Sequence, residues 1–205
     1  MKNKAAVVVG GGNIAYRKTV GLLQAGADVT VISPAIHLKM AVLFKNNQIT
    51  WKNKLFEEQD LHSAIIVIAA TNQPKVNEFV ALSAGNHQFV NVVDSQALSD
   101  FQVPAKLERG DLTISVATGG ASPALAMVIR DELAEKYDDS YKAYVDFLAL
   151  ARDQVKSSVV DQQTKLRLLK VITGEAYRQS YHMQQAFLEM ISDLEKPSHH
   201  HFILI

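Results

Sequence analysis

The feature that most constrains the fold is a run of three glycines directly behind a short apolar segment. The apolar segment Ala5–Val9 ends at Gly10, and an amphipathic, helix-like pattern begins at Ile14. Gly10, Gly12 and Ala15 have the spacing of the Rossmann fingerprint G-x-G-x-x-A, and they stand between a strand and a helix as that motif requires. The sequence therefore predicts a dinucleotide-binding α/β domain at the N-terminus.

Short apolar runs rich in Val and Ile recur along the first half of the chain. Amphipathic stretches separate these runs, which is typical of βα units in a parallel sheet buried on both faces. Pro74 stands where a helix can begin without losing a hydrogen bond, and we expect that helix to run to about residue 84. We expect two later pieces, 101–104 and 112–116, to extend or edge the same sheet. The recurring runs are 29–32, 49–52, 65–69 and 89–93.

From Ser122 onward the pattern is helical only. Apolar residues recur at i, i+3 or i+4 in three stripes, which is typical of amphipathic helices. About 80 residues of short helices make a thin core, so we expect the stripes to pack against the first domain or a second copy of the chain. We expect 197–202 to be a frayed tail. The stripes are Leu125, Val128, Ile129 and Leu133; Tyr141, Tyr144, Val145 and Leu148; and Met183, Phe187, Met190, Ile191 and Leu194.

Composition excludes several classes of protein. The chain holds 21 basic and 21 acidic residues, so no overall charge favours nucleic acid or an anionic membrane. The N-terminal apolar run is too short for an export signal and no run could span a bilayer, so we expect a cytoplasmic protein that binds no membrane. No cysteine is present, which excludes disulfides and thiolate catalysis. We predict no metal site. His199–His201 lie in the tail, and the other four histidines are scattered without the spacing of metal ligands. These four are His37, His62, His87 and His182.

The glycine loop predicts how the cofactor phosphates are held. Gly10 permits a tight turn and Gly12 lets a pyrophosphate approach the backbone. The amides around Asn13 and Ile14 form the positive end of the following helix, which favours phosphate. The alternative is a glycine turn in a Rossmann-like domain that binds nothing.

The residues after the second apolar run bear on the choice of cofactor. An NAD site commonly has an acidic residue there for the ribose hydroxyls, but this chain has Ser33, Pro34 and Ala35. We predict that these three contact the ribose. No arginine stands there for a 2′-phosphate, which favours NAD over NADP. Thr71, followed by Asn72, is predicted to lie over the adenine side, the alternative being a plain capping turn.

Several segments resemble one family. Residues 10–18 and 25–34 resemble the opening of the precorrin-2 dehydrogenase family, a module also found at the N-terminus of siroheme synthase. Asn91–Asp94 is similar to the segment that carries the family's catalytic aspartate, and residues 118–126 are similar to its glycine-rich turn into the dimerisation helix. The matching segments occur in order and span about residues 5–135.

The resemblance implies a function and an organisation. It implies oxidation of precorrin-2, a tetrapyrrole, to sirohydrochlorin with NAD in siroheme biosynthesis, and some family members also insert ferrous iron to form siroheme. It implies a homodimer with a Rossmann-type domain, a dimerisation segment and a small all-helical C-terminal domain. We place these at residues 1–112, 113–140 and 141–205.

The resemblance also points to individual residues. Asp94, just beyond an apolar run, is expected to be the general base of the oxidation, the alternative being a strand-end cap. The turn formed by Thr118, Gly119, Gly120 and Ser122 is expected to bind a substrate carboxylate, the alternative being a plain capped helix start. Siroheme synthases often have serine where this chain has Thr118. Basic residues that can pair with other substrate carboxylates, or remain solvated, are Arg17, Lys18, Lys106, Arg109 and Arg130.

Two other interpretations remain. The first is a regulatory Rossmann module that binds NAD while Asp94 has no chemical role. The second is a different small Rossmann oxidoreductase, which is disfavoured because no Tyr-x-x-x-Lys pair follows the predicted sheet. Conversion of precorrin-2 with NAD distinguishes these interpretations from a precorrin-2 dehydrogenase.

Overall fold

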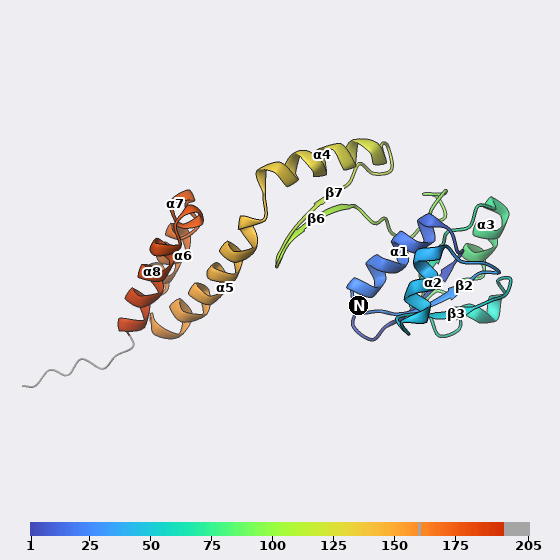
Figure 1. Ribbon diagram of the computed structural model, residues 1–205, viewed down its shortest axis with the longest axis horizontal. Coiled ribbons are helices and arrows are strands. Elements are labelled where there is room, and N and C mark those ends of the chain that lie inside the picture. Colours follow the sequence, from blue (N-terminus) through green and yellow to red (C-terminus); the bar gives the residue numbers. More distant parts are fainter. Residues whose placement is uncertain (160, 195–205) are drawn as a thin grey trace, which may run out of the picture. The chain divides into compact units, whose positions relative to one another are not determined.

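The computed structural model describes residues 1–159 and 161–194 (Figure 1). The chain divides into two compact units, Met1–Val103 and Pro104–Ile205. The predicted tail, including His199–His201, lies outside the described residues.

The first unit is built on a parallel sheet. The strands follow the order β3-β2-β1-β4-β5, and all four neighbouring pairs are parallel. The central strands are buried almost without interruption, because helices cover both faces of the sheet. All five predicted strands are therefore confirmed, and the fold is of the Rossmann type. The strands are β1 (Ala5–Val9), β2 (Asp28–Ile32), β3 (Thr50–Lys52), β4 (Ile66–Ala69) and β5 (Phe89–Val92).

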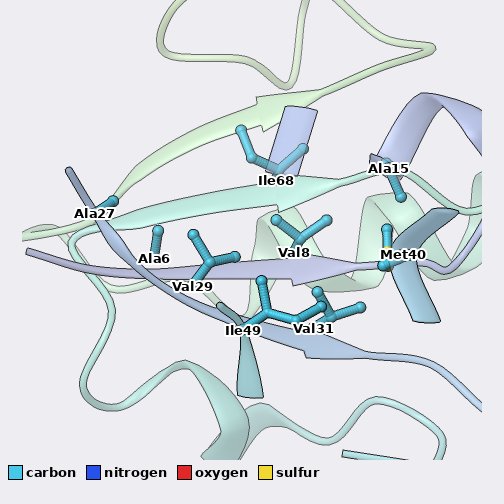
Figure 2. Packing of buried hydrophobic residues seen from close by; sticks show 10 residues of the cluster. Ala6, Val8, Ala15, Ala27, Val29, Val31, Met40, Ile49 and Ile68 are labelled. Atoms are coloured by element: carbon cyan, nitrogen blue, oxygen red, sulfur yellow. The ribbon is translucent and has the colours of Figure 1, made fainter. Parts of the chain in front are cut away.

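Helices from the first two connections cover one face of the sheet, and helices from the next two cover the other. On one face α1 (Asn13–Gln24) and α2 (Leu38–Lys45) contribute Ala15 and Met40 to a buried cluster. Figure 2 shows these two side chains beside Val8, Val31 and others from the strands. On the other face lie α3 (Pro74–Leu82) and a 3₁₀ helix, η1 (Glu58–Leu61), which contribute Val80 and Leu61 to a second cluster.

The topology determines where a ligand can bind. The chain leaves β1 through α1 toward β2, and it later returns to β4 on the other side of β1. The loops after β1 and β4 therefore diverge at the carboxyl edge of the sheet, and ligands of open α/β sheets bind in the crevice that this reversal opens.

One expectation about the sheet was wrong. Residues 101–104 form no strand, and the segment 112–116 belongs to a separate antiparallel hairpin of β6 (Ala105–Arg109) and β7 (Leu112–Val116) in the second unit. The free edge of β5 is already occupied by the loop that follows it. Val90 N–H donates to Asp100 Oδ2 at 2.8 Å, and Val92 N–H donates to Ser99 Oγ at 2.9 Å. The outward-facing groups of Val90 and Val92 in the described structure are thus used by this loop and not by another strand.

The second unit continues with helices, as predicted. The first, α4 (Pro123–Lys136), packs on the hairpin, where Leu107 and Ala126 are buried. Four further helices enclose an aromatic-rich core in which Tyr144 Oη donates to Ile172 O at 2.8 Å. These helices are α5 (Ser140–Ser158), α6 (Gln162–Val171), α7 (Glu175–Gln179) and α8 (Tyr181–Asp193).

The buried stripes are narrower than the sequence suggests. In α8, Phe187 and Ile191 are buried, whereas Met190 is exposed. In α4, Leu125 and Val128 are exposed. Among the described residues, no helix is long and apolar enough to span a membrane, and no three His, Cys, Asp or Glu side chains are grouped as metal ligands.

Candidate active site

Two of the three glycines are required by close packing of the loop after β1. Gly10 has a φ of +125°, and a Cβ there would lie 2.3 Å from the Ala70 carbonyl oxygen. A Cβ on Gly11 would lie 1.8 Å from the Ala35 carbonyl oxygen. The loop is therefore pressed against the segments that follow β4 and β2, and neither position tolerates a side chain.

Gly12 is different because it faces open space. It is the N-cap residue of α1, and a Cβ there would meet no atom within 4 Å. The first helical hydrogen bond runs from Tyr16 N–H to Gly12 O, so the amides of Asn13 and Ile14 precede the helical ladder. These amides and the positive helix end suit a phosphate, and a side chain on Gly12 would fill the space beside them.

A cleft of about 660 Å³ lies at this edge of the sheet. It is lined by the loops after β1, β2, β3 and β4, and its volume is typical of a site for a cofactor. The predicted cofactor residues are brought together here. They are Gly10, Gly12, Asn13, Ile14, Ser33, Pro34, Ala35 and Thr71.

The segment after β2 is held by its own hydrogen bonds. Ser33 Oγ donates to Ala35 O at 2.7 Å, and Trp51 Nε1 donates to Ser33 O at 2.9 Å. Because the Ser33 hydroxyl proton is used within the loop, this oxygen can only accept a hydrogen bond from a ligand. A ribose hydroxyl is such a donor.

The segment after β3 also lines the cleft, which the sequence did not reveal. Lys54, Leu55 and Phe56 are all in its wall. Lys54 Nζ lies 2.9 Å from Glu57 Oε2 and 3.1 Å from Asp60 Oδ2. The hydrogen bonds to Glu57 and then to Asp60 raise the pKa of Lys54. One sequence signal could have pointed to these residues: they follow the third predicted strand, which ends at the same edge of the sheet as the first two.

Thr71 connects the cleft to a buried side chain of α3. Thr71 N–H donates to Asn77 Oδ1 at 3.0 Å, and Thr71 Oγ1 donates to the same atom at 2.8 Å. Gln73 N–H donates to Thr71 Oγ1 at 3.1 Å, so Thr71 also caps the turn before α3. A capping turn and a position over the adenine side of the cofactor are both compatible with these hydrogen bonds.

Asp94 lies two residues beyond β5, at the carboxyl edge where the sequence placed it. It is exposed, and Asn77 Nδ2 donates to its Oδ1 at 3.0 Å. Asp94 does not line the larger cleft; it lies in a smaller hollow of about 290 Å³ with Lys75 and Glu78. Asn77 is therefore the link between the cleft residue Thr71 and the candidate base.

The remaining predicted residues belong to the second unit. Ser122 Oγ accepts from Leu125 N–H at 3.2 Å, so it is the N-cap of α4 with Pro123 at the first helical position. Thr118 Oγ1 accepts from Ser122 N–H at 3.1 Å, and Gly119 and Gly120 form the exposed turn between them. The capped helix start is confirmed, and substrate binding by this turn stays a prediction.

Three of the basic candidates already have acidic neighbours within their unit. Salt bridges join Lys106 to Glu108, Arg109 to Asp139 and Arg130 to Asp131. In the first unit, burial and the neighbouring charge of Arg17 lower the pKa of Lys18.

This sheet order, with a glycine loop at a helix N-terminus and a cleft beside it, defines a Rossmann-type nucleotide-binding protein. Family models agree with this class. Residues 1–105 match a model described as "Putative NAD(P)-binding", residues 109–136 match "Sirohaem biosynthesis protein central", and residues 141–187 match "SirC C-terminal domain".

Whole-chain similarity identifies the family. The chain is 36% identical over 191 residues to the precorrin-2 dehydrogenase of Priestia megaterium, covering 93% of this chain and 95% of that protein. A solved structure of SirC, precorrin-2 dehydrogenase, superposes with a TM-score of 0.82 and covers 94% of this chain. The siroheme synthase of Xylella fastidiosa (strain M12) is 37% identical over 172 residues, and these make up 36% of its length. The chain belongs to the precorrin-2 dehydrogenase and siroheme synthase family.

Proposed function

We propose that this protein is a cytoplasmic enzyme that oxidises precorrin-2 to sirohydrochlorin with NAD in siroheme biosynthesis. The observation that carries the proposal is the position of a carboxylate, Asp94, at the same sheet edge as a dinucleotide cleft. Two hydrogen-bonded side chains, Thr71 and Asn77, connect the cleft to that carboxylate. Similarity to a precorrin-2 dehydrogenase over nearly the whole chain supports the choice of substrate.

The chain's own residues have separate tasks in this reaction. Oxidation removes two hydrogens from the substrate as a hydride and a proton, and a bound nicotinamide supplies the hydride acceptor. The amides at the start of α1 hold the cofactor phosphates, and Asp94 takes the proton. The turn at Thr118, Gly119, Gly120 and Ser122 binds a substrate carboxylate through its backbone and hydroxyl groups.

Electrostatics of the cleft favour NAD over NADP. Of the described residues 1–159 and 161–194, Lys54 is the one cation that lines the cleft, and Glu57 and Asp60 already neutralise it. A 2′-phosphate would therefore enter without a free positive partner. We expect NADP to bind at least about 10-fold more weakly than NAD, which corresponds to about 1.4 kcal/mol.

Calorimetric titration of the same preparation with both cofactors measures this difference. Glu57→Gln removes one of the two acidic partners of Lys54, and we expect it to narrow the difference by improving NADP binding. Equal affinity of the parent protein for both cofactors would contradict the electrostatic argument.

We extend the proposal to iron insertion, with ferrous iron as a substrate. Its support is the similarity to siroheme synthases, of which the chain spans about a third. In this second reaction Asp94 would help to remove pyrrole protons. The measured rate of iron insertion must be compared with the rate of spontaneous insertion of ferrous iron into sirohydrochlorin.

The central test is Asp94→Asn. Asn keeps the shape and still offers an oxygen to Asn77, but it cannot take a proton. We expect normal folding, unchanged NAD affinity and a loss of at least about 10²-fold in turnover of precorrin-2, followed by the absorbance of sirohydrochlorin.

A matched control is Asp28→Asn, at the opposite, amino end of β2 and exposed. This variant should oxidise precorrin-2 at the parent rate. If Asp94→Asn also oxidised precorrin-2 at the parent rate, the base would be another group or solvent. If neither the parent nor the variants oxidised precorrin-2, a regulatory protein that only binds NAD would be favoured.

A further inference from the structure

The starting observation is a fully buried amide in the middle of a helix. Asn77 lies in α3 and is 0% exposed, although asparagine is a poor helix former and is mostly found at the surface. A buried amide is tolerated only when its donors and acceptor are satisfied. Its partners therefore indicate its purpose.

All four hydrogen bonds of the Asn77 side chain go to two loops. Oδ1 accepts from Thr71 N–H at 3.0 Å and from Thr71 Oγ1 at 2.8 Å. Nδ2 donates to Thr71 O at 3.2 Å and to Asp94 Oδ1 at 3.0 Å. Thr71 follows β4 and Asp94 follows β5, so one side chain joins the carboxyl ends of two neighbouring strands.

The orientation of this amide is determined by its partners. A backbone N–H can only donate, so the Asn77 atom that faces Thr71 N–H must be the oxygen. The NH₂ group then necessarily faces Asp94, and it requires an acceptor there. An ionised carboxylate at Asp94 provides that acceptor.

The arrangement distinguishes the two oxygens of Asp94. Oδ1 accepts from Asn77, whereas within residues 1–159 and 161–194 no hydrogen bond is made to Oδ2. The charged groups that share the hollow are Lys75 and Glu78, both on α3; the residues that β5 and its following loop contribute beside Asp94 are uncharged.

We propose that Asn77 is a positioning residue that holds Asp94 Oδ1 and the cofactor loop at Thr71 in one hydrogen-bonded unit, leaving Asp94 Oδ2 to take the proton. This inference rests on the proposed function, since it assigns a task to the base named there. Asn77 acts through Asp94 and Thr71.

The decisive variant is Asn77→Asp. The new side chain has nearly the same shape and can still accept from both Thr71 donors, so the cofactor loop keeps two of its three hydrogen bonds to residue 77; the bond from Nδ2 to Thr71 O is lost at every pH. When protonated, the introduced carboxyl can donate to Asp94 as the amide does. When ionised, it cannot donate, and it places a second negative charge against Asp94.

We expect a rate that depends on pH in a way the parent's does not. As pH rises from about 5 to about 8, turnover of Asn77→Asp should fall about 10-fold to 10²-fold, because one hydrogen bond to a charged group is lost. The KM for precorrin-2 and the affinity for NAD should remain within about twofold of the parent. Recovery at low pH separates positioning of the base from a structural role.

The matched control is Gln88→Glu. Gln88 is another buried amide, and its Nε2 donates to Ala64 O at 2.9 Å, away from Asp94. This variant should be less stable to urea than the parent and yet keep the parent's pH profile of turnover. Both variants are compared at a temperature where circular dichroism shows them folded.

A double variant separates failure of this inference from failure of the proposed function. In an Asp94→Asn background, Asn77→Asp should change the residual rate by less than about twofold, because the group it positions is gone. Full turnover by Asp94→Asn alone would overturn the proposed base. The positioning role alone would be overturned if Asp94→Asn were inactive while Asn77→Asp kept the parent's pH profile of turnover. It would also be overturned if Asp94→Asn were inactive and Asn77→Asp lost turnover by the same factor at every pH.

Discussion

At the scale of single residues, the three adjacent glycines have different physical causes. Gly10 and Gly11 are required by the protein itself, since a Cβ on either would overlap a carbonyl oxygen of a neighbouring loop. A Cβ on Gly12 would meet no atom within 4 Å. We therefore attribute the glycine at position 12 to the approach of a cofactor phosphate to the helix end.

This difference predicts opposite results for two substitutions. Gly12→Val should fold with the parent's stability to urea and lose NAD binding at least about 10²-fold, because the side chain fills the place of the pyrophosphate. Gly11→Ala should instead lower the free energy of unfolding by about 1–3 kcal/mol, since the loop must shift. Calorimetry and urea denaturation measure both. Unchanged NAD affinity in folded Gly12→Val would remove the site from this loop.

At the scale of elements, η1 is held by an unusually buried carboxylate. The Asp60 side chain is 3% exposed, and Glu57 N–H donates to its Oδ2 at 3.1 Å. Burial alone would raise the pKa of Asp60, but the hydrogen bonds from Glu57 N–H, Lys54 and Lys52 outweigh it, so the pKa is lowered. This element also fixes Lys54 in the wall of the cleft.

The lowered pKa predicts how stability depends on pH. Because the folded-state pKa lies below the unfolded value of about 3.9, the stabilisation by Asp60 is present above about pH 4 and is lost as pH falls through the folded-state pKa. Asp60→Asn should therefore reduce the free energy of unfolding by about 1–3 kcal/mol at pH 7, with the difference from the parent shrinking below pH 4.

Urea denaturation at a series of pH values measures this dependence. Glu58→Gln, an exposed change in the same 3₁₀ helix, serves as the control and should follow the parent at every pH. A constant difference between parent and Asp60→Asn from pH 7 to pH 3 would show that the carboxylate's charge is not what stabilises η1.

At the scale of the whole molecule, α4 presents apolar side chains that its own unit does not bury. Leu125 is 51% exposed and Val128 is 53% exposed. Adjacent large apolar side chains on a surface commonly mark an interface, and two-fold homodimers are the commonest assembly. We propose a homodimer in which residues 112–137 and the helices after them take part.

The dimer has a direct test by mass. Sedimentation velocity at micromolar concentration should give about twice 22.6 kDa for the parent and 22.6 kDa for the double variant Leu125→Glu, Val128→Glu. The control is Leu82→Glu, an equally apolar side chain in the first unit that is 73% exposed. This control should stay dimeric. A monomeric parent with full activity would refute the assembly.

Local spacing in the sequence was sufficient to predict much of the secondary structure and the place of the cofactor cleft. The five apolar runs became the five strands, Pro74 and Ser122 mark helix starts, and the glycine loop lies at the cleft. These features depend on residues close together in the chain, where periodicity and capping act. The place of Asp94 beyond β5 followed from the same logic.

Tertiary structure alone decided the rest. The hairpin of β6 and β7 is separate because Ser99 and Asp100 occupy the edge of β5, a contact that no periodicity reveals. Lys54 reaches the cleft because β3 ends at the same edge of the sheet as β1 and β2. Asn77 of α3 bonds to both Thr71 and Asp94 because β4 and β5 end side by side. Pairing of strand ends is a long-range property, so the residues it brings together carry no signature in the sequence around each of them.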